Sequence, residues 1–202
     1  MATLFGWLLE NPWVYRLQTA VLAPGAEAAI LRRIEQVLQV LPPAQRLLDV
    51  GCGPRSWLFR IGLRPVGADV SLSYLGEYVR AGGSAVAASA DVLPIAGESF
   101  DAVWSLGLLH HLPDRVAAAA VREMLRVCRP GGSVVVFDAV LPQSSWRRPL
   151  AYAIRRCDRG RFMRLESALR ALLPRQVDWH CERFTYARTG LEGLLCWGTT
   201  AR

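Results

Sequence analysis

The sequence contains no lysine, so its net charge of +7 rests on 24 arginines against 17 acidic residues. Although 52% of the residues are hydrophobic, no uncharged run reaches the roughly 18 residues that a membrane-spanning helix needs. The first ten residues hold no basic residue and end on Glu10, which is unlike a secretory signal peptide. These absences predict a cytoplasmic protein, and the length of 202 residues suits one domain.

Cysteine and histidine are scarce and scattered. The sequence has five cysteines, three histidines and no Cys-x-x-Cys pair, which disfavours a zinc site and a disulfide framework. We therefore expect no metal and predict that the thiols are reduced and act as small core residues. The cysteines are Cys52, Cys128, Cys157, Cys181 and Cys196.

The positive charge is concentrated in the last third of the chain. Residues 1–138 hold 12 arginines and 12 acids, whereas residues 139–202 hold 12 arginines and 5 acids. Residues 146–164 alone carry seven arginines against Asp158. Such a run is most often a solvated surface, but it could bind an anionic acceptor or dock on an anionic membrane surface or an acidic carrier protein. The candidate residues for acceptor binding are Arg147, Arg148, Arg155 and Arg156.

Short apolar runs alternate with amphipathic segments through the first two thirds of the chain. Helical spacing of apolar residues predicts helices over Ala26–Leu41 and Asp114–Cys128. Strands that alternate with helices indicate βαβ units and a parallel sheet. The predicted strands are Arg46–Val50, Pro65–Val70, Ala85–Ala90, Phe100–Ser105 and Ser133–Asp138.

The C-terminal part has a different pattern. Residues 143–173 mix loop and basic helix, and the strand-like runs Val177–Ala187 and Leu191–Thr199 are joined by a short connection with Gly190, which predicts an antiparallel hairpin. We expect a single domain of residues 1–202, with a helical cap (1–45), a cofactor-binding core (46–138) and a basic lid plus hairpin (139–202). The apolar residues at the N-terminus could pack on the sheet, cover an acceptor or lie at a membrane interface.

The most specific motif follows the first predicted strand. Asp49 ends the strand, and Gly51 and Gly53 form a Gly-x-Gly turn that lets a ligand approach the backbone, with a helix expected beyond it. Asp69 ends the next strand, 18 residues after Gly51, where a carboxylate can accept two ribose hydroxyls. Alone, the turn is common and Asp69 would be a solvated strand end; together they favour a nucleoside-containing cofactor.

Six motifs in order give the chain a family resemblance. It resembles the class I methyltransferases of the type 11 group over about residues 45–138, which implies S-adenosylmethionine as cofactor. The resemblance also implies a Rossmann-like α/β three-layer sandwich whose mostly parallel, seven-stranded sheet ends in a C-terminal antiparallel hairpin. The motifs are Asp49–Gly53, Gly67–Ser71, Ala90–Pro94, Phe100–Val103, Leu109–Asp114 and Leu125–Gly132.

The resemblance assigns roles to individual residues. Those that would line the methionine part of the cofactor are Asp49, Gly51, Gly53, Ser105 and Leu106. Asp69 would bind the ribose, Asp91 the adenine amino group, and the Val92 amide the ring edge. Arg55 departs from the family, which usually has a third glycine there. It is either a tolerated, outward-turned side chain or a partner for the methionine carboxylate or an anionic substrate.

The acceptor side is less defined. A hydroxyl or protonated amine acceptor needs a base, and His110 and His111 are the candidates, although packing of their loop is an alternative role. We predict methyl transfer to a small-molecule or lipid-like acceptor, anionic if the arginines bind it, by a cytoplasmic enzyme that could lie peripherally at the membrane. The alternative is a non-catalytic, S-adenosylmethionine-binding partner protein. A nicotinamide-dependent dehydrogenase is disfavoured, and so is a nucleic-acid acceptor, because no RNA-binding module accompanies the arginines.

Overall fold

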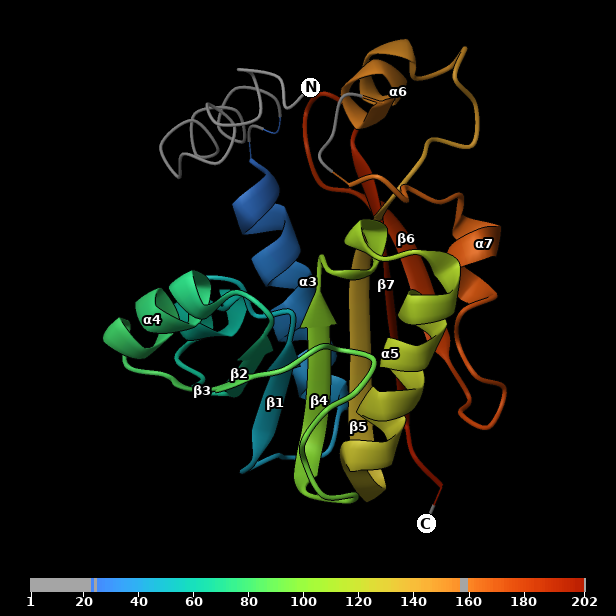
Figure 1. Cartoon of the computed structure of the whole chain (residues 1–202). Helices are drawn as coiled ribbons and strands as arrows, with labels where there is room; N and C mark the ends of the chain where they lie inside the picture. Colours follow the sequence, from blue (N-terminus) through green and yellow to red (C-terminus); the bar gives the residue numbers. More distant parts are fainter. Residues whose placement is uncertain (1–22, 24, 157–159, 202) are drawn as a thin grey trace.

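The structure is a computed structural model that describes residues 23, 25–156 and 160–201. The apolar N-terminal residues discussed above lie outside this range. Figure 1 shows the elements. In chain order they are α3 (Ala26–Val40), β1 (Leu47–Val50), the 3₁₀ helix η1 (Trp57–Ile61), β2 (Val66–Asp69), α4 (Leu72–Arg80), β3 (Ser84–Ala87), β4 (Phe100–Leu106), the 3₁₀ helix η2 (Leu109–His111), α5 (Asp114–Val127), β5 (Cys128–Val140), α6 (Pro149–Arg156), α7 (Glu166–Arg170), β6 (His180–Thr185) and β7 (Glu192–Thr199).

The sheet has seven strands in the order β3-β2-β1-β4-β5-β7-β6. Strands β1 to β5 pair in parallel, and β7 runs antiparallel to both β5 and β6. The predicted α/β fold class, with its mostly parallel sheet and C-terminal antiparallel hairpin, is therefore confirmed. Because the parallel strands end at one edge, the loops after β1, β2, β4 and β5 meet there.

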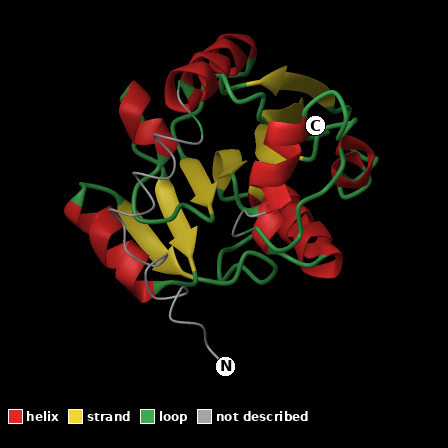
Figure 2. Ribbon diagram, turned by 90° about the horizontal axis from the view of Figure 1, so that it is seen from above, coloured by secondary structure: helices red, strands yellow, loops and turns green. Residues whose placement is uncertain are grey.

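Helices cover both faces of the sheet, which makes three layers (Figure 2). On one face α3 packs its buried residues, such as Ile30 and Ile34, against Trp104 of β4. On the other face α5 packs Val121 and Met124 against Val103 and its neighbours. Both clusters are apolar and buried, as expected for an amphipathic helix that lies on a sheet. No helix in the described part of the chain is both long and apolar enough to cross a membrane.

The segment after the glycine turn differs from the prediction of a helix. Only the five-residue 3₁₀ helix η1 forms there. The Ser56 side chain accepts a hydrogen bond from the Leu58 amide at its start, and Gly62, with φ of 81°, ends it. Only four residues then separate η1 from β2, so the chain cannot complete a longer helix before the next strand begins.

Strand β5 is longer than predicted at both ends, and α5 stops one residue earlier. The strand begins at Cys128, five residues before its predicted start, and includes Pro130, Gly131 and Gly132. Its pairing with β4 shifts register between Phe100 and Ala102, so this glycine-rich stretch forms an irregular first part of the strand.

The hairpin corrects one expectation about the cysteines. Cys181 on β6 lies opposite Cys196 on β7, and the two form a disulfide rather than two reduced thiols. Their separation of 15 residues gives no sign of this pairing, because only the hairpin register brings the two Cβ atoms together. Cys52 and Cys128 are free and buried, as predicted.

Candidate active site

The turn after β1 is held in place at the carboxyl edge of the sheet. Gly51 has φ of 74°, and its amide donates to the Ala68 carbonyl on β2 at 2.8 Å. A Cβ at Gly51 would lie 2.7 Å from the Leu108 side chain, so this glycine is required both by backbone conformation and by space. The sequence pattern did not point to Leu108, which closes over the turn from the loop after β4.

Asp49 is buried beneath this turn, and only one of its two carboxylate oxygens has a hydrogen-bond partner among the described residues. Its carboxylate is 2% exposed, and Oδ2 accepts a hydrogen bond of 2.5 Å from the Ser56 hydroxyl. Oδ1 has no hydrogen-bond partner among the described residues. Burial raises the pKa of Asp49 to about 6, and the negative charge of Asp69 adds to the effect. A buried carboxylate oxygen in this position fits a cationic ligand, such as the ammonium group of a bound amino acid.

Asp69 organises the same loop from the end of β2. Its Oδ2 accepts from the Gly53 amide at 3.0 Å, and its Oδ1 accepts from the Ser71 amide at 2.9 Å. A carboxylate has about four acceptor positions, so two remain for the two hydroxyls of a ribose. The space where a Cβ of Gly53 would lie is open, which leaves room for a ligand beside the turn.

Asp91 and Val92 lie in the loop after β3. The Asp91 carboxylate accepts a hydrogen bond from the Ser89 hydroxyl, and the Val92 amide donates to the Ser89 carbonyl at 3.1 Å. The Val92 side chain is largely exposed, as is that of Val70 after β2. The adenine contact of Asp91 stays a prediction. The Val92 amide would have to exchange its bond to Ser89 in order to reach a ring nitrogen.

Ser105 and Leu106 do not present their side chains at this edge. Both are buried at the end of β4, and Leu106 packs with Phe137 in the core on the α3 side of the sheet. The Ser105 hydroxyl has no hydrogen-bond partner in the part of the chain that the structure describes. Any cofactor contact of these two residues would therefore come from their backbone.

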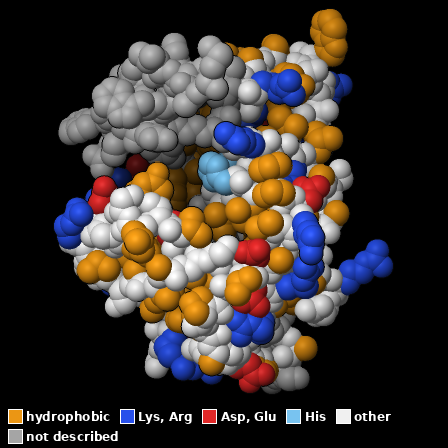
Figure 3. Space-filling view, in the orientation of Figure 1, with side chains coloured by type: hydrophobic (Ala, Val, Ile, Leu, Met, Phe, Trp, Pro, Cys, Tyr) orange, Lys and Arg blue, Asp and Glu red, His pale blue; other side chains and the backbone are white. Residues whose placement is uncertain are grey.

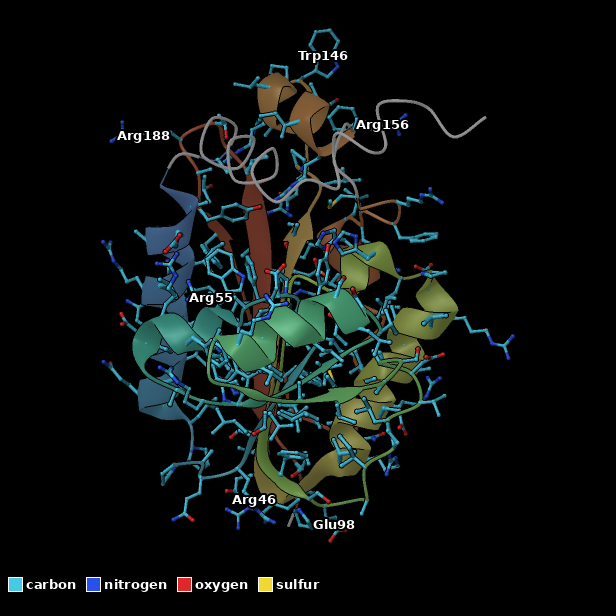
Figure 4. The ribbon with its side chains drawn as sticks, turned by 60° about the vertical axis from the view of Figure 1, so that its left-hand side comes forward. Arg46, Arg55, Glu98, Trp146, Arg156 and Arg188 are labelled. Atoms are coloured by element: carbon cyan, nitrogen blue, oxygen red, sulfur yellow. A yellow bond between two sulfur atoms is a disulfide. The ribbon has the colours of Figure 1, made fainter. Side chains whose placement is uncertain are left out.

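Arg55 is exposed at the start of the segment that leads into η1. Figure 4 places it at the level of α4, whereas Arg46 lies at the opposite end of the sheet. Its position is therefore on the cofactor side, which fits both a cofactor carboxylate and an outward-turned side chain.

The loop after β4 brings His110 against the end of β5. The His110 Nδ1 lies 2.5 Å from the Asp138 Oδ1, and the His110 amide donates to Asp138 Oδ2 at 2.9 Å. The His110 side chain is 13% exposed and Asp138 is 1% exposed. A carboxylate that binds Nδ1 places the proton on that nitrogen and the lone pair on Nε2, the tautomer that a general base needs.

Two neighbours confine the His110 ring. A Cβ at Gly160 would lie 2.2 Å from its Cδ2, so the lid approaches the ring as closely as a glycine allows. The His111 ring is tilted against it, with 4.0 Å between centroids. Around this edge the surface is hollowed and lined by hydrophobic side chains, with a histidine at its rim (Figure 3).

The sequence did not identify Asp138 and Gly160 as parts of this site. Asp138 could have been found, since β4 and β5 are neighbours and their carboxyl ends must lie side by side. Gly160 could not, because its approach depends on how the lid folds back.

The described arginines of the basic segment divide into two groups. Three of them tie the lid to the protein. Arg148 donates to Thr185 and to the Gly190 carbonyl at 3.0 Å each, and buried Arg155 donates to the Tyr186 hydroxyl. Arg164 donates to the Leu109 carbonyl at 2.7 Å and to Leu112 at 2.6 Å, next to the histidine loop.

The other group, which includes Arg147 and Arg156, is exposed. The four arginines predicted to bind an acceptor thus do not form one cluster. Arg148 and Arg155 have bonds within the fold, and only Arg147 and Arg156 face the solvent.

Comparisons with known proteins agree with this geometry. Residues 48–136 match a family model described as a methyltransferase domain. These residues therefore form a methyltransferase domain of the type 11 group. Its cofactor is S-adenosylmethionine, and the orphan Asp49 oxygen and the open side of Gly53 fit the ammonium and methionine part of that molecule.

Relatives of this methyltransferase domain occur in several bacteria. Methyltransferase GfsG of Streptomyces halstedii is 39% identical over 132 residues, which cover 58% of this chain and 46% of that protein. The 27-O-demethylrifamycin SV methyltransferase of Amycolatopsis mediterranei is 33% identical over 132 residues, 58% of this chain and 48% of that protein. Relatives outside the bacteria are named as a tRNA methyltransferase in Arabidopsis thaliana and a probable tRNA methyltransferase in Homo sapiens. The chain spans about half the length of the curated bacterial relatives described here, or less.

A solved structure shows the same fold at low sequence identity. An S-adenosylmethionine-dependent methyltransferase from Thermotoga maritima superposes with a TM-score of 0.71 at 16% identity, covering 96% of this chain and 99% of that one.

Proposed function

We propose that this chain transfers the methyl group of S-adenosylmethionine to a hydroxyl group of a small-molecule acceptor, with His110 as the base and Asp138 as its positioning residue. The observation that carries the proposal is the contact between His110 Nδ1 and Asp138 Oδ1, formed at the end of β4 and β5 beside the cofactor loops. The cofactor supplies an activated methyl group on a sulfonium. The protein therefore has to align the acceptor, exclude water and remove a proton.

The His110 loop is built to keep the ring in one orientation. Asp138 holds Nδ1 and the backbone amide of the same residue, and the lid residue Phe162 donates its amide to the His110 carbonyl at 3.0 Å. Nε2 would then accept the acceptor proton as the new bond to carbon forms. The resulting imidazolium would be stabilised by the adjacent Asp138 carboxylate.

The apolar lining of the hollow supports a small, largely hydrophobic acceptor. The rifamycin methyltransferase among the relatives is named for such a small molecule. The proposal includes an anionic or lipid-like acceptor, because the exposed Arg147 and Arg156 are available to bind its anionic group. Arg148 and Arg155 are poorer candidates for that role because they have bonds within the fold.

The experiment measures transfer of labelled methyl groups from S-adenosylmethionine to fractions of a cell extract, namely small molecules, lipids, RNA and protein. We expect label in an organic-soluble small molecule. Label in the RNA fraction alone would contradict the small-molecule assignment. Binding of S-adenosylhomocysteine without transfer to any fraction would favour the alternative of a non-catalytic partner protein.

Once an acceptor has been identified, the role of His110 is tested by mutation. We expect His110→Ala to lower kcat by about 100-fold or more with an unchanged Kd for S-adenosylhomocysteine. Asp138→Asn should also lower kcat with an unchanged Kd for S-adenosylhomocysteine, since the amide no longer fixes the orientation and tautomer of the imidazole. His180→Ala is the matched control, because His180 is exposed on β6 and stacks on Trp197. Near-normal kcat in His110→Ala would refute the assignment.

A further inference from the structure

The lid helix α6 has an outward face that the proposed reaction does not use. Its inward face is defined by Ala151 and Arg155, one turn apart and both buried. On the side away from these two residues, Leu150 is 57% exposed and Ala153 is exposed nearly one turn further on. Trp146, which is 93% exposed, lies in the turn just before α6 that the bond from the Arg148 amide to the Ser144 carbonyl closes. We call Trp146, Leu150 and Ala153 the outer stripe.

Cationic side chains flank the outer stripe. Arg147 follows Trp146 in the turn before α6 and Arg156 is the last residue of α6, and both are exposed. The only acidic residue in the sequence between 139 and 165 is Asp158. Figure 4 shows Trp146, Arg156 and Arg188 at the same end of the molecule, directed away from it. An apolar stripe between arginines at an extremity is the arrangement of a segment that lies in a membrane interface.

From these observations we infer that the outer stripe with Arg147 and Arg156 docks this protein on an anionic lipid bilayer. Trp146 and Leu150 insert at the level of the headgroups, and the two guanidinium groups bind lipid phosphates. A protein partner fits less well, because a stable protein interface buries about 800 Å² on each side and a two-turn helix at a convex end offers far less. Arg155, bonded to Tyr186 and to the Glu192 carbonyl, anchors the helix from below.

The docking surface and the methyl-transfer site lie at the same end of the sheet, beyond the carboxyl ends of the parallel strands. Helix α6 follows β5 beyond its carboxyl end, the end that also carries Asp138 (Figure 1). A bilayer bound there would face the histidine loop across the lid. Lipid binding can be measured without a methyl acceptor, so this inference is tested independently of the proposed reaction.

The test is flotation of the full chain with vesicles of phosphatidylcholine alone and of equal parts phosphatidylcholine and phosphatidylglycerol. We expect binding to the anionic vesicles only, weakened by salt. The pair Arg147→Glu and Arg156→Glu should reduce binding by roughly 30-fold or more, from about fivefold per charge removed. The pair Trp146→Ser and Leu150→Ser should reduce it by about tenfold.

Matched controls carry the same changes elsewhere. Val40→Ser with Val79→Ser removes two apolar side chains that are 68% and 55% exposed, and Arg32→Glu with Arg122→Glu reverses two exposed charges. Both should bind like the parent protein, and thermal unfolding checks that all four variants are folded. Brominated phosphatidylglycerol should quench the parent's tryptophan fluorescence more than that of Trp146→Phe.

Three outcomes would overturn the inference. The first is equal binding to neutral and anionic vesicles. The second is binding by either lid variant that is as strong as that of the parent protein, which would mean that another part of the surface binds the vesicles. The third is a concentration-dependent dimer that Trp146→Ser with Leu150→Ser abolishes, which would identify a second copy of the chain as the occupant of the stripe.

Discussion

Two buried aspartates at opposite ends of the sheet differ in the hydrogen bonds and ion pairs that their carboxylates form. Asp101, at the amino end of β4, accepts the Gln45 and Arg46 amides at 2.9 and 2.8 Å and pairs with Arg129 at 3.0 Å. These contacts, the Arg46 amide first, hold its pKa below the ordinary value. Asp49, at the carboxyl end of β1, has Ser56 on one oxygen and no partner for the other among the described residues, and burial raises its pKa.

The contrast separates a structural carboxylate from one that we propose binds the cofactor. A buried charge is costly unless hydrogen bonds and opposite charges surround it. Asp101 meets that condition within the protein and joins the loop before β1 to β4. Asp49 does not meet it, so a cationic ligand would complete its coordination. The four predictions below test this difference and the cofactor site around Asp49.

The largest effect is expected from replacing each aspartate in turn. Asp49→Asn should weaken S-adenosylhomocysteine binding by about 100-fold, because the ligand ammonium loses a buried ionic partner. Its folded-state pKa lies above the unfolded value, so ionised Asp49 lowers stability as the pH rises through about 6. The cofactor-free variant should therefore unfold at the same or a higher temperature at neutral pH.

Asp101→Asn should show the reverse pattern. We expect a loss of about 2 kcal/mol of stability, or roughly 5 °C in Tm, with an unchanged Kd. Calorimetric titration measures the Kd for S-adenosylhomocysteine of both variants, and thermal unfolding measures their Tm. The proposed difference between the two aspartates is wrong if Asp101→Asn alters cofactor affinity or if Asp49→Asn does not.

A smaller effect is expected at the end of β2. Asp69→Ala should weaken S-adenosylhomocysteine binding by about tenfold, since the ribose hydroxyls lose two acceptors and the Gly53 amide loses its bond. Asp178→Ala, on the loop before β6, is the control because its carboxylate is exposed and distant from the edge. An unchanged dissociation constant for Asp69→Ala would remove Asp69 from the cofactor site.

The smallest effect is the pH dependence of cofactor binding. With a pKa of about 6, Asp49 is mostly ionised at pH 7.5 but only about a quarter ionised at pH 5.5. If the ammonium binds the ionised form, affinity should fall about fourfold between these values. Isothermal titration at several pH values measures it, and the dependence should disappear in Asp49→Asn. A dependence that persists in this variant would point to another group.

The sequence anticipated the part of the molecule that depends on neighbouring residues. Helical spacing predicted α3 and α5, and the alternation of apolar runs predicted a parallel sheet. The hairpin was expected from the short connection around Gly190. The motif order identified the family and its cofactor, since the residues of the glycine turn are contiguous in the chain. These features follow from local preferences and from the fixed geometry of βαβ units.

Other features depended on contacts between distant residues. Whether an arginine of the basic segment faces solvent or the interior is decided by where α6 packs. Arg155 therefore lies buried against Tyr186, and Arg156, next to it in sequence, lies outside. The short 3₁₀ helix after the glycine turn and the Cys181–Cys196 bond were missed for the same reason.

A few neighbouring residues encode the order of the predicted strands, the glycine turn and the acidic residues at the strand ends, so these features could be predicted from the sequence. Tertiary packing sets the contact between Asp138 and His110, the approach of Gly160 to that ring and the lack of a partner for one Asp49 oxygen among the described residues. The physical reason is that hydrogen bonding and burial depend on which atoms meet in space. Residues far apart in the chain meet only after the sheet and its lid have packed.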